Sequence, residues 1–277
     1  MLSVSELKSV LGTHHLRLTK RLGQHHLIDP GLLRRIVGSC GATSRETVVE
    51  IGAGLGALTE GLAERAGRVI AVEADRGIAA LLTQRMRTTA NVEVRCEDIL
   101  AFSWEGLEDA VVVGAIPYHI TSPILVALCE HRRLIRQATL VVQREVGERL
   151  LAKPGTKAYG RLSVLGQHCW EMSKVLAVPR GAFYPQPEVD SVCLKLTRHA
   201  GDSPKSVDEP LFFAVVKAAF ATRRKTLVKC LAEADGLGLT RAAAQKAVRA
   251  LGLPAAVRGE QLSLEQFAAL AASLKRQ

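Results

Sequence analysis

From Thr47 onward the chain alternates short apolar runs with amphipathic stretches, and few folds accommodate that order. Strands that alternate with helices are typical of a parallel sheet with helices on both faces. We predict strands at Thr47–Ile51, Arg68–Glu73, Val92–Arg95, Ala110–Gly114 and Ala138–Gln143. Two later strand-like segments, Ser163–Trp170 and Ser191–Leu196, are expected to complete the sheet with an antiparallel edge.

The same patterns divide the chain into parts. Residues 1–28 are basic and rich in histidine, and Asp29-Pro30 then provides a helix N-cap and first turn. A polar segment with two prolines, residues 201–209 and the proline that follows, is typical of a linker. Beyond it the periodicity is helical only. We therefore predict an N-terminal segment at 1–28, an α/β domain at 29–200, a linker at 201–209 and a small all-α domain at 210–277.

Composition sets limits on the partners. Hydrophobic residues make up 48% of the 277 residues, so the chain can bury a substantial core. Lys and Arg number 37 against 27 Asp and Glu, a net charge of +10 that favours a polyanionic partner such as RNA. Only 4% are aromatic, which argues against a broad surface for stacking single-stranded bases.

The cysteines and the apolar segments exclude other classes. Six cysteines lie far apart without a CxxC pair, so zinc-ligand spacing is absent and we expect no metal. No apolar stretch reaches the length of a membrane span, and the N-terminus lacks a secretory apolar segment. We expect a reduced, cytoplasmic protein without a membrane partner, and nothing in the sequence suggests an obligate dimer, so we expect a monomer.

A glycine-rich turn follows the first predicted strand, within Val49–Gly56. Gly52 and Gly54 let the backbone approach a ligand closely, and the next helix begins with a positive dipole end. Glu50 lies just before this turn, and Glu73 ends the second strand, where a carboxylate can accept hydrogen bonds from ribose hydroxyls. This loop fits a methyltransferase, a nicotinamide enzyme or a structural turn.

Asp98-Ile99 follows the third strand in the same way. Its carboxylate could accept from the amino group of a cofactor adenine, although an aspartate there could equally cap a helix or sit in a loop. Three such features, after the first, second and third strands, describe one crevice at the carboxyl edge of a sheet. Together, Glu73 and Asp98 favour a cofactor that contains a nucleoside.

After the fourth strand, Ala115-Ile116-Pro117-Tyr118 resembles the Asn-(Leu/Ile/Pro)-Pro-(Tyr/Phe) motif of amino-methyltransferases that act on adenine. The resemblance implies that the motif side chain and the Ile116 carbonyl accept hydrogen bonds from the target amino group. It also implies that Pro117 stiffens the turn and that Tyr118 stacks on a flipped base. Positioning then supplies most of the rate, without a metal or a general base.

Ala115 departs from that motif, because a methyl group accepts no hydrogen bond. The lost partner costs on the order of 1–3 kcal/mol, which is roughly a ten- to hundredfold loss of rate. We therefore expect impaired turnover on an otherwise complete scaffold. An introduced inactivating substitution and a natural divergence towards a binding role both fit this residue.

Over nearly its whole length the chain resembles the ribosomal RNA adenine dimethyltransferases, above all those of the bacterial small subunit. The matching elements are Leu22–Leu27, Gln143–Val146, Lys153–Ser163, Phe183–Ser191, Phe220–Leu227 and Gly259–Phe267. The resemblance implies a Rossmann-like domain that uses S-adenosylmethionine, leaving S-adenosylhomocysteine. It implies dimethylation of two adjacent adenines near the 3′ end of small-subunit rRNA, on an immature small ribosomal subunit, late in its assembly.

Site residues follow from the same resemblance. Gln24, His25 and Leu27 belong to an element that caps the cofactor, with His26 where the family usually has Phe. Phe183 is expected to lie against the target base, opposite Tyr118. For RNA contact we predict a basic face that comprises Arg223, Arg224, Lys225, Lys153 and Lys157.

Three other readings remain. A relative that acts on large-subunit rRNA, as in macrolide resistance, is disfavoured by the stretch Lys153–Gly160. A non-catalytic ribosome-assembly or RNA-binding factor would bind immature subunits without the cofactor. A nicotinamide oxidoreductase ranks last, because no hydride-transfer partner lies near the fourth strand.

Overall fold

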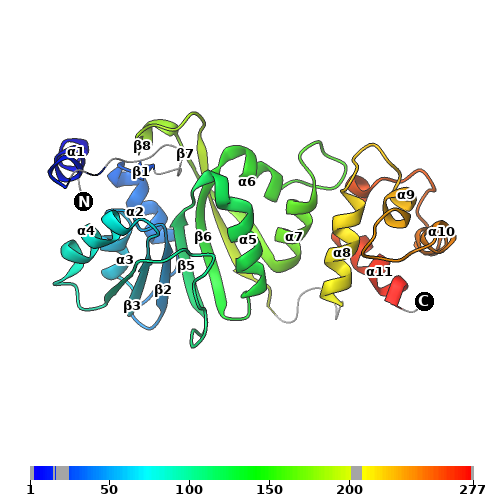
Figure 1. Ribbon diagram of the computed structural model, residues 1–277, viewed down its shortest axis with the longest axis horizontal. Helices are drawn as coiled ribbons and strands as arrows, with labels where there is room; N and C mark the ends of the chain where they lie inside the picture. The colour runs from blue at the N-terminus through cyan, green and yellow to red at the C-terminus, as the bar shows by residue number, and fades with distance from the viewer. Residues whose placement is uncertain (1–2, 15, 17–24, 201–207, 276–277) are drawn as a thin grey trace. The chain divides into compact units, whose positions relative to one another are not determined.

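The computed structural model describes residues 3–14, 16, 25–200 and 208–275. Within these residues the main sheet has strands β2 Thr47–Ile51, β3 Arg68–Val72, β4 Val92–Arg95, β5 Ala110–Ala115, β6 Ile135–Gln143, β7 Trp170–Val178 and β9 Ser191–Arg198. Their order across the sheet is β4-β3-β2-β5-β6-β9-β7 (Figure 1). The neighbours from β4 to β6 pair parallel, and β6 pairs with β9 antiparallel. The predicted α/β sheet with an antiparallel strand is confirmed.

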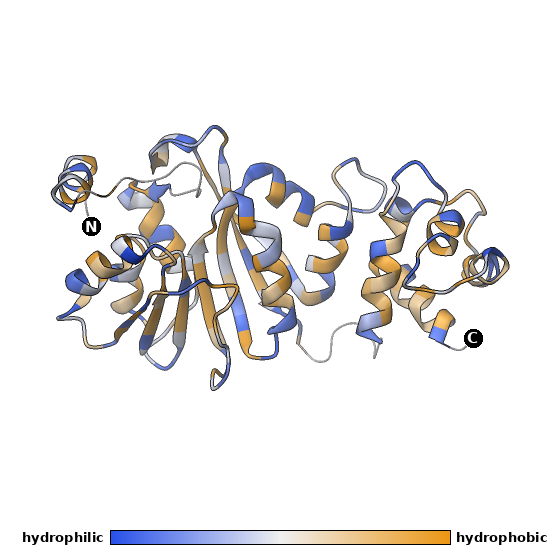
Figure 2. Ribbon diagram, viewed as in Figure 1, coloured by the Kyte–Doolittle hydropathy of each residue, from blue (hydrophilic) through white to orange (hydrophobic). Residues whose placement is uncertain are grey.

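Helices α2 Pro30–Ser39, α3 Thr59–Ala63, α4 Arg76–Met86 and α5 Thr121–Glu130 cover the sheet. Helix α2 begins where we predicted, because the Asp29 carboxylate accepts from the Leu32 N–H at 2.9 Å and Pro30 opens the first turn. Its buried residues pack in one cluster with Leu62 of α3 and with valines of the sheet. The central strands are hydrophobic along most of their length, as Figure 2 shows.

The prediction of a strand at Ser163–Trp170 is wrong. These residues form helix α7, Arg161–Cys169, and strand β7 begins only at Trp170. The Ser163 hydroxyl caps the helix, since its oxygen accepts from the Gly160 N–H at 3.0 Å while it donates to the Arg149 carbonyl. Val164 and His168, one helical turn apart, are both buried, so a helical spacing was present beside the apolar run.

The N-terminal part contains two elements that we did not predict. Helix α1, Val4–Thr13, begins with a capping box between Ser3 and Glu6. Strand β1, His26–Leu27, pairs antiparallel with β8, Phe183–Tyr184. This pairing brings the N-terminal segment against the segment that follows β7.

Two compact units divide the chain. The sheet unit comprises Met1–Gly147 with Glu171–Arg198, and the helical unit comprises Glu148–Trp170 with His199–Gln277. Helix α6, Arg144–Leu150, spans the boundary, and the helical unit contains α7 with α8 Glu209–Ala219, α9 Leu227–Ala232, α10 Arg241–Ala250 and α11 Leu264–Lys275. This division differs from the predicted domains, which assigned residues 148–170 to the α/β part. Residues 201–207 of the predicted linker lie outside the described residues, and Asp208 caps α8.

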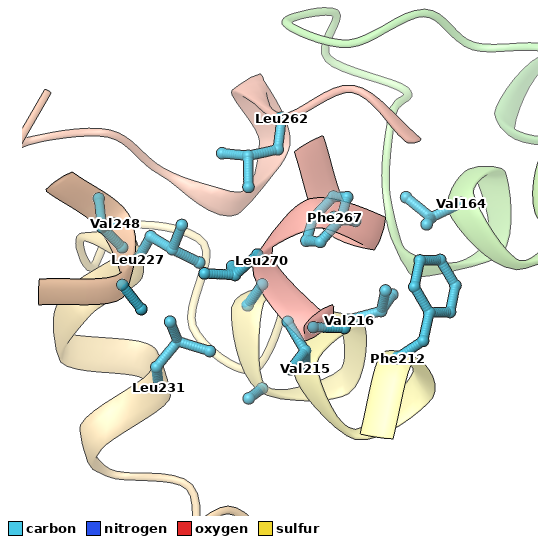
Figure 3. Packing of buried hydrophobic residues seen from close by; sticks show 14 of the residues in the cluster. Val164, Phe212, Val215, Val216, Leu227, Leu231, Val248, Leu262, Phe267 and Leu270 are labelled. Atoms are coloured by element: carbon cyan, nitrogen blue, oxygen red, sulfur yellow. The ribbon is translucent and has the colours of Figure 1, made fainter. Parts of the chain in front are cut away.

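The helical unit has its own hydrophobic core. Phe212, Val215 and Val216 of α8 meet Phe267 and Leu270 of α11 (Figure 3). Residues from the chain before β7 join the same cluster: Ala152, Tyr159 and Val164. Burial of these side chains is the physical reason that residues 148–170 belong with the C-terminal helices.

Replacing Phe267 by Ala tests this packing. Phe267 is fully buried, so its removal leaves a cavity, and we expect the free energy of unfolding of the helical unit to fall by about 3–5 kcal/mol. Denaturant unfolding monitored by circular dichroism measures the change. Lys246→Ala, at an exposed position of α10, is the control and is expected to stay within about 0.5 kcal/mol of the parent. Similar values for the two variants would contradict this core.

Candidate active site

The register of the parallel strands brings several strand ends to one edge of the sheet. Ile51 of β2 pairs with Val72 of β3 and with Gly114 of β5, and Val72 pairs with Arg95 of β4. The residues that follow these strands therefore lie together. They include the glycine turn, Glu73 and Asp98, and Ala115 ends β5 at the same edge.

The glycine turn is folded back onto the neighbouring strand. The N–H groups of Gly52 and Ala53 donate to the Val72 carbonyl at 2.9 and 3.1 Å. Gly52 and Gly54 have φ values of +67° and +58°, a region that favours glycine. The Gly54 N–H donates to Glu73 at 2.9 Å, so the turn and the second strand end are directly connected.

Glu73 is nearly buried and accepts one backbone hydrogen bond on each carboxylate oxygen. The Gly54 N–H binds one oxygen and the Asp75 N–H binds the other, both at 2.9 Å. Burial raises the pKa of Glu73, and these two hydrogen bonds oppose that shift. Each carboxylate oxygen has a second acceptor site, so Glu73 can still accept from a ligand hydroxyl.

Asp98 and Ile99 differ in exposure. Ile99 is buried, whereas Asp98 is exposed and one of its oxygens accepts from the Leu100 N–H at 2.9 Å. One carboxylate oxygen of Asp98 thus makes the hydrogen bond expected of a loop aspartate, and the other oxygen is available to a ligand.

Glu50 is buried beneath the turn and accepts from the Thr59 hydroxyl at 2.6 Å. Burial raises its pKa from 4.5 to about 8; the Thr59 hydrogen bond opposes this shift, and the charge of Glu73 adds to it. The folded protein therefore holds a proton that the unfolded chain releases near pH 4.5. This contribution to stability is complete below pH 4.5 and is lost as the pH rises through about 8.

We expect Glu50→Gln to remove this part of the pH dependence. The fall in the free energy of unfolding between pH about 5 and pH about 8 should shrink by at least about 1.4 kcal/mol, the equivalent of one pKa unit. Glu73 contributes in the same direction and is retained in the variant. Denaturant titrations at the two pH values measure the effect, and an undiminished fall in the variant would contradict it.

A cavity of about 560 Å³ lies at this edge, within the usual size range of small-molecule sites. Its lining contains ten of the predicted site residues: His25, Leu27, Glu50, Gly52, Gly54, Glu73, Asp98, Ile99, Ala115 and Pro117. Ile116, Tyr118 and Phe183 are described but lie outside that lining, and Gln24 lies outside the described residues. In the described part of the chain no cluster of His, Cys, Asp and Glu is arranged to hold a metal ion.

The turn after β5 is fixed by the main chain and by one tyrosine. The Ile116 N–H donates to the Val141 carbonyl at 3.0 Å, which continues the pairing of β5 with β6. The Tyr118 hydroxyl and the Ser191 hydroxyl lie 2.9 Å apart, and burial raises the pKa of Tyr118. Tyr118 thus has a fixed orientation beside the cavity.

Phe183 is buried rather than open to a ligand. Only 5% of it is exposed, and it packs in the cluster that contains Leu27 and Leu33. Stacking on a base therefore requires Phe183 to become more exposed than it is in this structure.

Two histidines close the cavity at β1. The His25 Nδ1 lies 2.6 Å from the Pro185 carbonyl oxygen, and its ring stacks on Tyr118. The ring of His26 lies over Gly54, and burial lowers its pKa to about 4, so it is neutral. In the sequence, one feature singled out His26: the resemblance given above has Phe at this position.

Sequence reasoning missed several further lining residues. They follow the predicted ones in the chain: Ala57, Leu58, Ala74–Ile78, His119 and Ile120. Their positions just beyond each strand end could have indicated them, since the same edge of the sheet holds them all.

The predicted basic residues all belong to the helical unit and differ in their partners. Arg223 is bound to Glu260 at 2.5 Å and to the Lys157 carbonyl at 2.7 Å. Lys225 pairs with Glu233 at 2.6 Å. The other three, Lys153, Lys157 and Arg224, have exposed side chains.

No helix in the described ranges is both long enough and apolar enough to cross a membrane. The chain also resembles known proteins. The family described as ribosomal RNA adenine dimethylase matches residues 15–275. The ribosomal RNA small subunit methyltransferase A of Bacillus mycoides (strain KBAB4) is 40% identical over 276 residues, covering 96% of this chain and 94% of that protein.

Two solved structures extend the comparison. A dimethyladenosine transferase from Plasmodium falciparum gives a TM-score of 0.79 at 26% identity, covering 90% of this chain and 97% of that one. The 23S rRNA methyltransferase ErmE gives a TM-score of 0.69 at 29% identity, covering 90% and 99%. Both similarities extend through the sheet unit and the helical unit.

Proposed function

This chain belongs to the ribosomal RNA adenine dimethylase family, and from that premise we propose its substrate and the role of each site residue. It is an S-adenosylmethionine-dependent rRNA adenine dimethyltransferase. We propose that it dimethylates the exocyclic amino groups of two adjacent adenines near the 3′ end of small-subunit rRNA. The supporting observation is the cavity at the carboxyl edge, which Ala115 and Pro117 of the target-base motif line together with Glu73.

The cavity fits the methyl donor. Glu73 retains acceptor sites for ribose hydroxyls, and Asp98 has a free oxygen for an adenine amino group. We assign Gly52, Gly54 and Ile99 to close contact with the nucleoside, and His25 and Leu27 to the cap over it. Glu50 lies under the glycine turn, and we assign Gln24, outside the described residues, to the same cap.

When bound, S-adenosylmethionine supplies an electrophilic methyl group and leaves as S-adenosylhomocysteine. The adenine amino nitrogen forms the N–C bond as the C–S bond breaks, and one amino proton passes to water. In our proposal the Ile116 carbonyl accepts one amino hydrogen, Pro117 fixes the turn, and Tyr118 and Phe183 hold the base. Ala115 provides no second acceptor, so turnover is impaired.

RNA contact is assigned to the helical unit. Lys153, Lys157 and Arg224 have exposed side chains and can contact phosphates directly. Arg223 and Lys225 are already paired to carboxylates, so their contribution requires exchange of partners. We propose that the protein binds an immature small subunit, late in its assembly, in the cytoplasm. We also propose that it acts as a monomer, since one chain carries every assigned residue.

Two substrates are distinguishable by experiment. The curated relative named for the small subunit is 40% identical, whereas ErmE, named for 23S rRNA, is 29% identical. The Ala115→Asn variant, incubated with labelled cofactor, is expected to label undermethylated small subunits and not protein-free large-subunit RNA. Labelling of the large-subunit RNA alone would favour the second substrate. If binding to immature subunits needs no cofactor, and neither the parent protein nor Ala115→Asn labels any RNA, a role as a non-catalytic assembly factor would replace our proposal.

A further inference from the structure

Helix α1 packs against segments that form the cavity. Leu7 and Leu11 are its buried residues. Both belong to a hydrophobic cluster that also contains Leu55 of the glycine turn and Ile78 of α4. Leu55 directly follows Gly54, and Ile78 lines the cavity itself. The first helix of the chain is therefore in contact with two of the segments that form the cofactor site.

Leu16 extends this contact beyond the helix. It packs on the same cluster, and its N–H donates to the Leu11 carbonyl at 2.9 Å. A Cβ atom at Gly77 would lie only 2.6 Å from Leu16 Cδ2, so the leucine covers the backbone of a residue that lines the cavity. Gly77 belongs to the first turn of α4, which is thus contacted both from α1 and from the segment that follows it.

The same helix contacts the short β1–β8 ladder. Lys8 Nζ lies 5.2 Å from the ring centroid of Tyr184, and Tyr184 packs against the cluster that contains Leu7. Tyr184 pairs with His26, and the ladder consists of only two residue pairs. A pair of strands this short is marginally stable by itself, so the contacts with α1 help to hold it in place.

Packing is also what orders α1. The helix has ten residues, and isolated helices shorter than about 12–15 residues are marginal in water. A capping box supports its first turn, but Leu7, Val10 and Leu11 form an apolar stripe at helical spacing that packing must remove from water. The order of α1 and the conformation of the segments beneath it are therefore coupled.

We propose that Leu7 and Leu11 are positioning residues for the methyl donor. Docked α1 holds the glycine turn and the first turn of α4 in the conformation that binds S-adenosylmethionine. The glycine turn needs such support, because Gly54 and Gly56 have positive φ values and glycine has more alternative backbone conformations than other residues. This inference rests on the proposed function in one respect, the assignment of the cavity to S-adenosylmethionine.

The first test is the affinity of the whole protein for S-adenosylmethionine, measured by isothermal titration. Leu7→Ala combined with Leu11→Ala removes most of the packing of α1, and we expect Kd to rise by roughly tenfold. Leu7→Met with Leu11→Met keeps the side-chain volume and is expected to stay within about threefold of the parent.

Leu107→Ala is the matched control for the alanine variant. Leu107 is 7% exposed, close to the 6% of Leu11, but it precedes β5, at the end of that strand opposite to Ala115. Its removal therefore destabilises the sheet unit without touching the segments that α1 contacts. We expect the Kd of Leu107→Ala to stay within about threefold of the parent.

The second test uses the parent protein alone, so it does not depend on the folding of a variant. Coupling between two sites is reciprocal, so the cofactor must stabilise docked α1 by the same factor by which docking raises cofactor affinity. We expect hydrogen exchange of the α1 amides to slow by roughly tenfold with saturating S-adenosylmethionine, while exchange in α10 of the helical unit stays unchanged.

The remaining outcomes contradict the inference or its premise. An unchanged Kd in the alanine variant, or an equal rise in Leu107→Ala, would show that α1 contributes only to general stability. A raised Kd without slower exchange in α1 would break the reciprocity and place the effect elsewhere. A parent protein that binds no S-adenosylmethionine would instead refute the cofactor assignment in the proposed function.

Discussion

Gly54→Ala is expected to weaken S-adenosylmethionine binding so strongly that concentrations just sufficient to saturate the parent protein leave most of the variant unbound. Gly54 has a φ of +58°, where a side chain is strained by about 1–2 kcal/mol. A Cβ atom there would also lie 2.5 Å from Cε1 and 2.8 Å from Nδ1 of His26. The pairing of His26 with Tyr184 in β1–β8 fixes the His26 backbone, so the ring itself must rotate to relieve the contact. Displacement of Gly54 would also disturb its hydrogen bond to Glu73, so we expect Kd to rise by roughly a hundredfold.

Gly106→Ala is the matched control for this prediction. Gly106 has a φ of +77°, yet a Cβ there would meet no heavy atom within 4 Å. The Gly106→Ala variant therefore has the backbone strain but no steric clash with a neighbouring residue. We expect a similar loss of stability, about 1–2 kcal/mol, with no change in cofactor affinity by isothermal titration. If Gly54→Ala binds the cofactor within about threefold of the parent, the assignment of this turn to the cofactor is wrong.

Ala115→Asn is expected to raise kcat by roughly ten- to a hundredfold on undermethylated small subunits. Asn restores a side-chain acceptor beside the Ile116 carbonyl, so both hydrogens of the amino group gain a partner before the methyl group is transferred. The gain should appear in kcat, because the interaction orients the reacting nitrogen. The Kd for S-adenosylmethionine is expected to stay within about threefold, since the turn at Gly54 and the Glu73 carboxylate are unchanged.

Ala115→Leu distinguishes the effect of a hydrogen-bond acceptor on kcat from the effect of a larger side chain. Leucine has the same branching and the same number of side-chain heavy atoms as asparagine but accepts no hydrogen bond. Steady-state rates of the three proteins, measured on one preparation of subunits, are expected to increase only for Ala115→Asn. An equal gain in Ala115→Leu, or equal and strong turnover of the parent and Ala115→Asn, would refute the importance of the missing acceptor.

Much of the cofactor site could be predicted from the sequence, because parallel strands place their carboxyl ends at one edge. Three separate signals lay at the ends of predicted strands: Gly54 and Asp98 follow the first and third strands, and Glu73 ends the second. All three line one cavity. The helix start at Asp29 was equally local, since a side-chain cap and a proline suffice to specify it.

Other features depend on contacts between distant segments and could not be found in this way. His26 lies over Gly54 only because β1 pairs with β8. Phe183 is buried in a cluster whose other members include residues of α2, β2 and β5, which are far from it in the chain. The strand predicted at Ser163 became a helix because its buried positions follow helical spacing against α8, a segment that begins some forty residues later in the chain.

The basic residues at Arg223–Lys225 also show how contacts in the folded chain limit prediction from sequence. Arg223 to Lys225 formed one run in the sequence, but Arg223 lies between Glu260 and the loop at Lys157, and Lys225 pairs with Glu233. A run of charges therefore does not by itself identify the residues that are free for phosphate, because the folded chain supplies its own carboxylates.

In our proposal this scaffold methylates the exocyclic nitrogen of adenine and lacks one acceptor for doing so. The most direct test is nucleoside analysis by mass spectrometry of small-subunit rRNA after incubation of undermethylated subunits with S-adenosylmethionine and either the parent or Ala115→Asn. We predict N6,N6-dimethyladenosine in the Ala115→Asn reaction and much less of it, in the same time, with the parent. Methyl groups found only on another nucleoside, or absent with both proteins, would contradict the account.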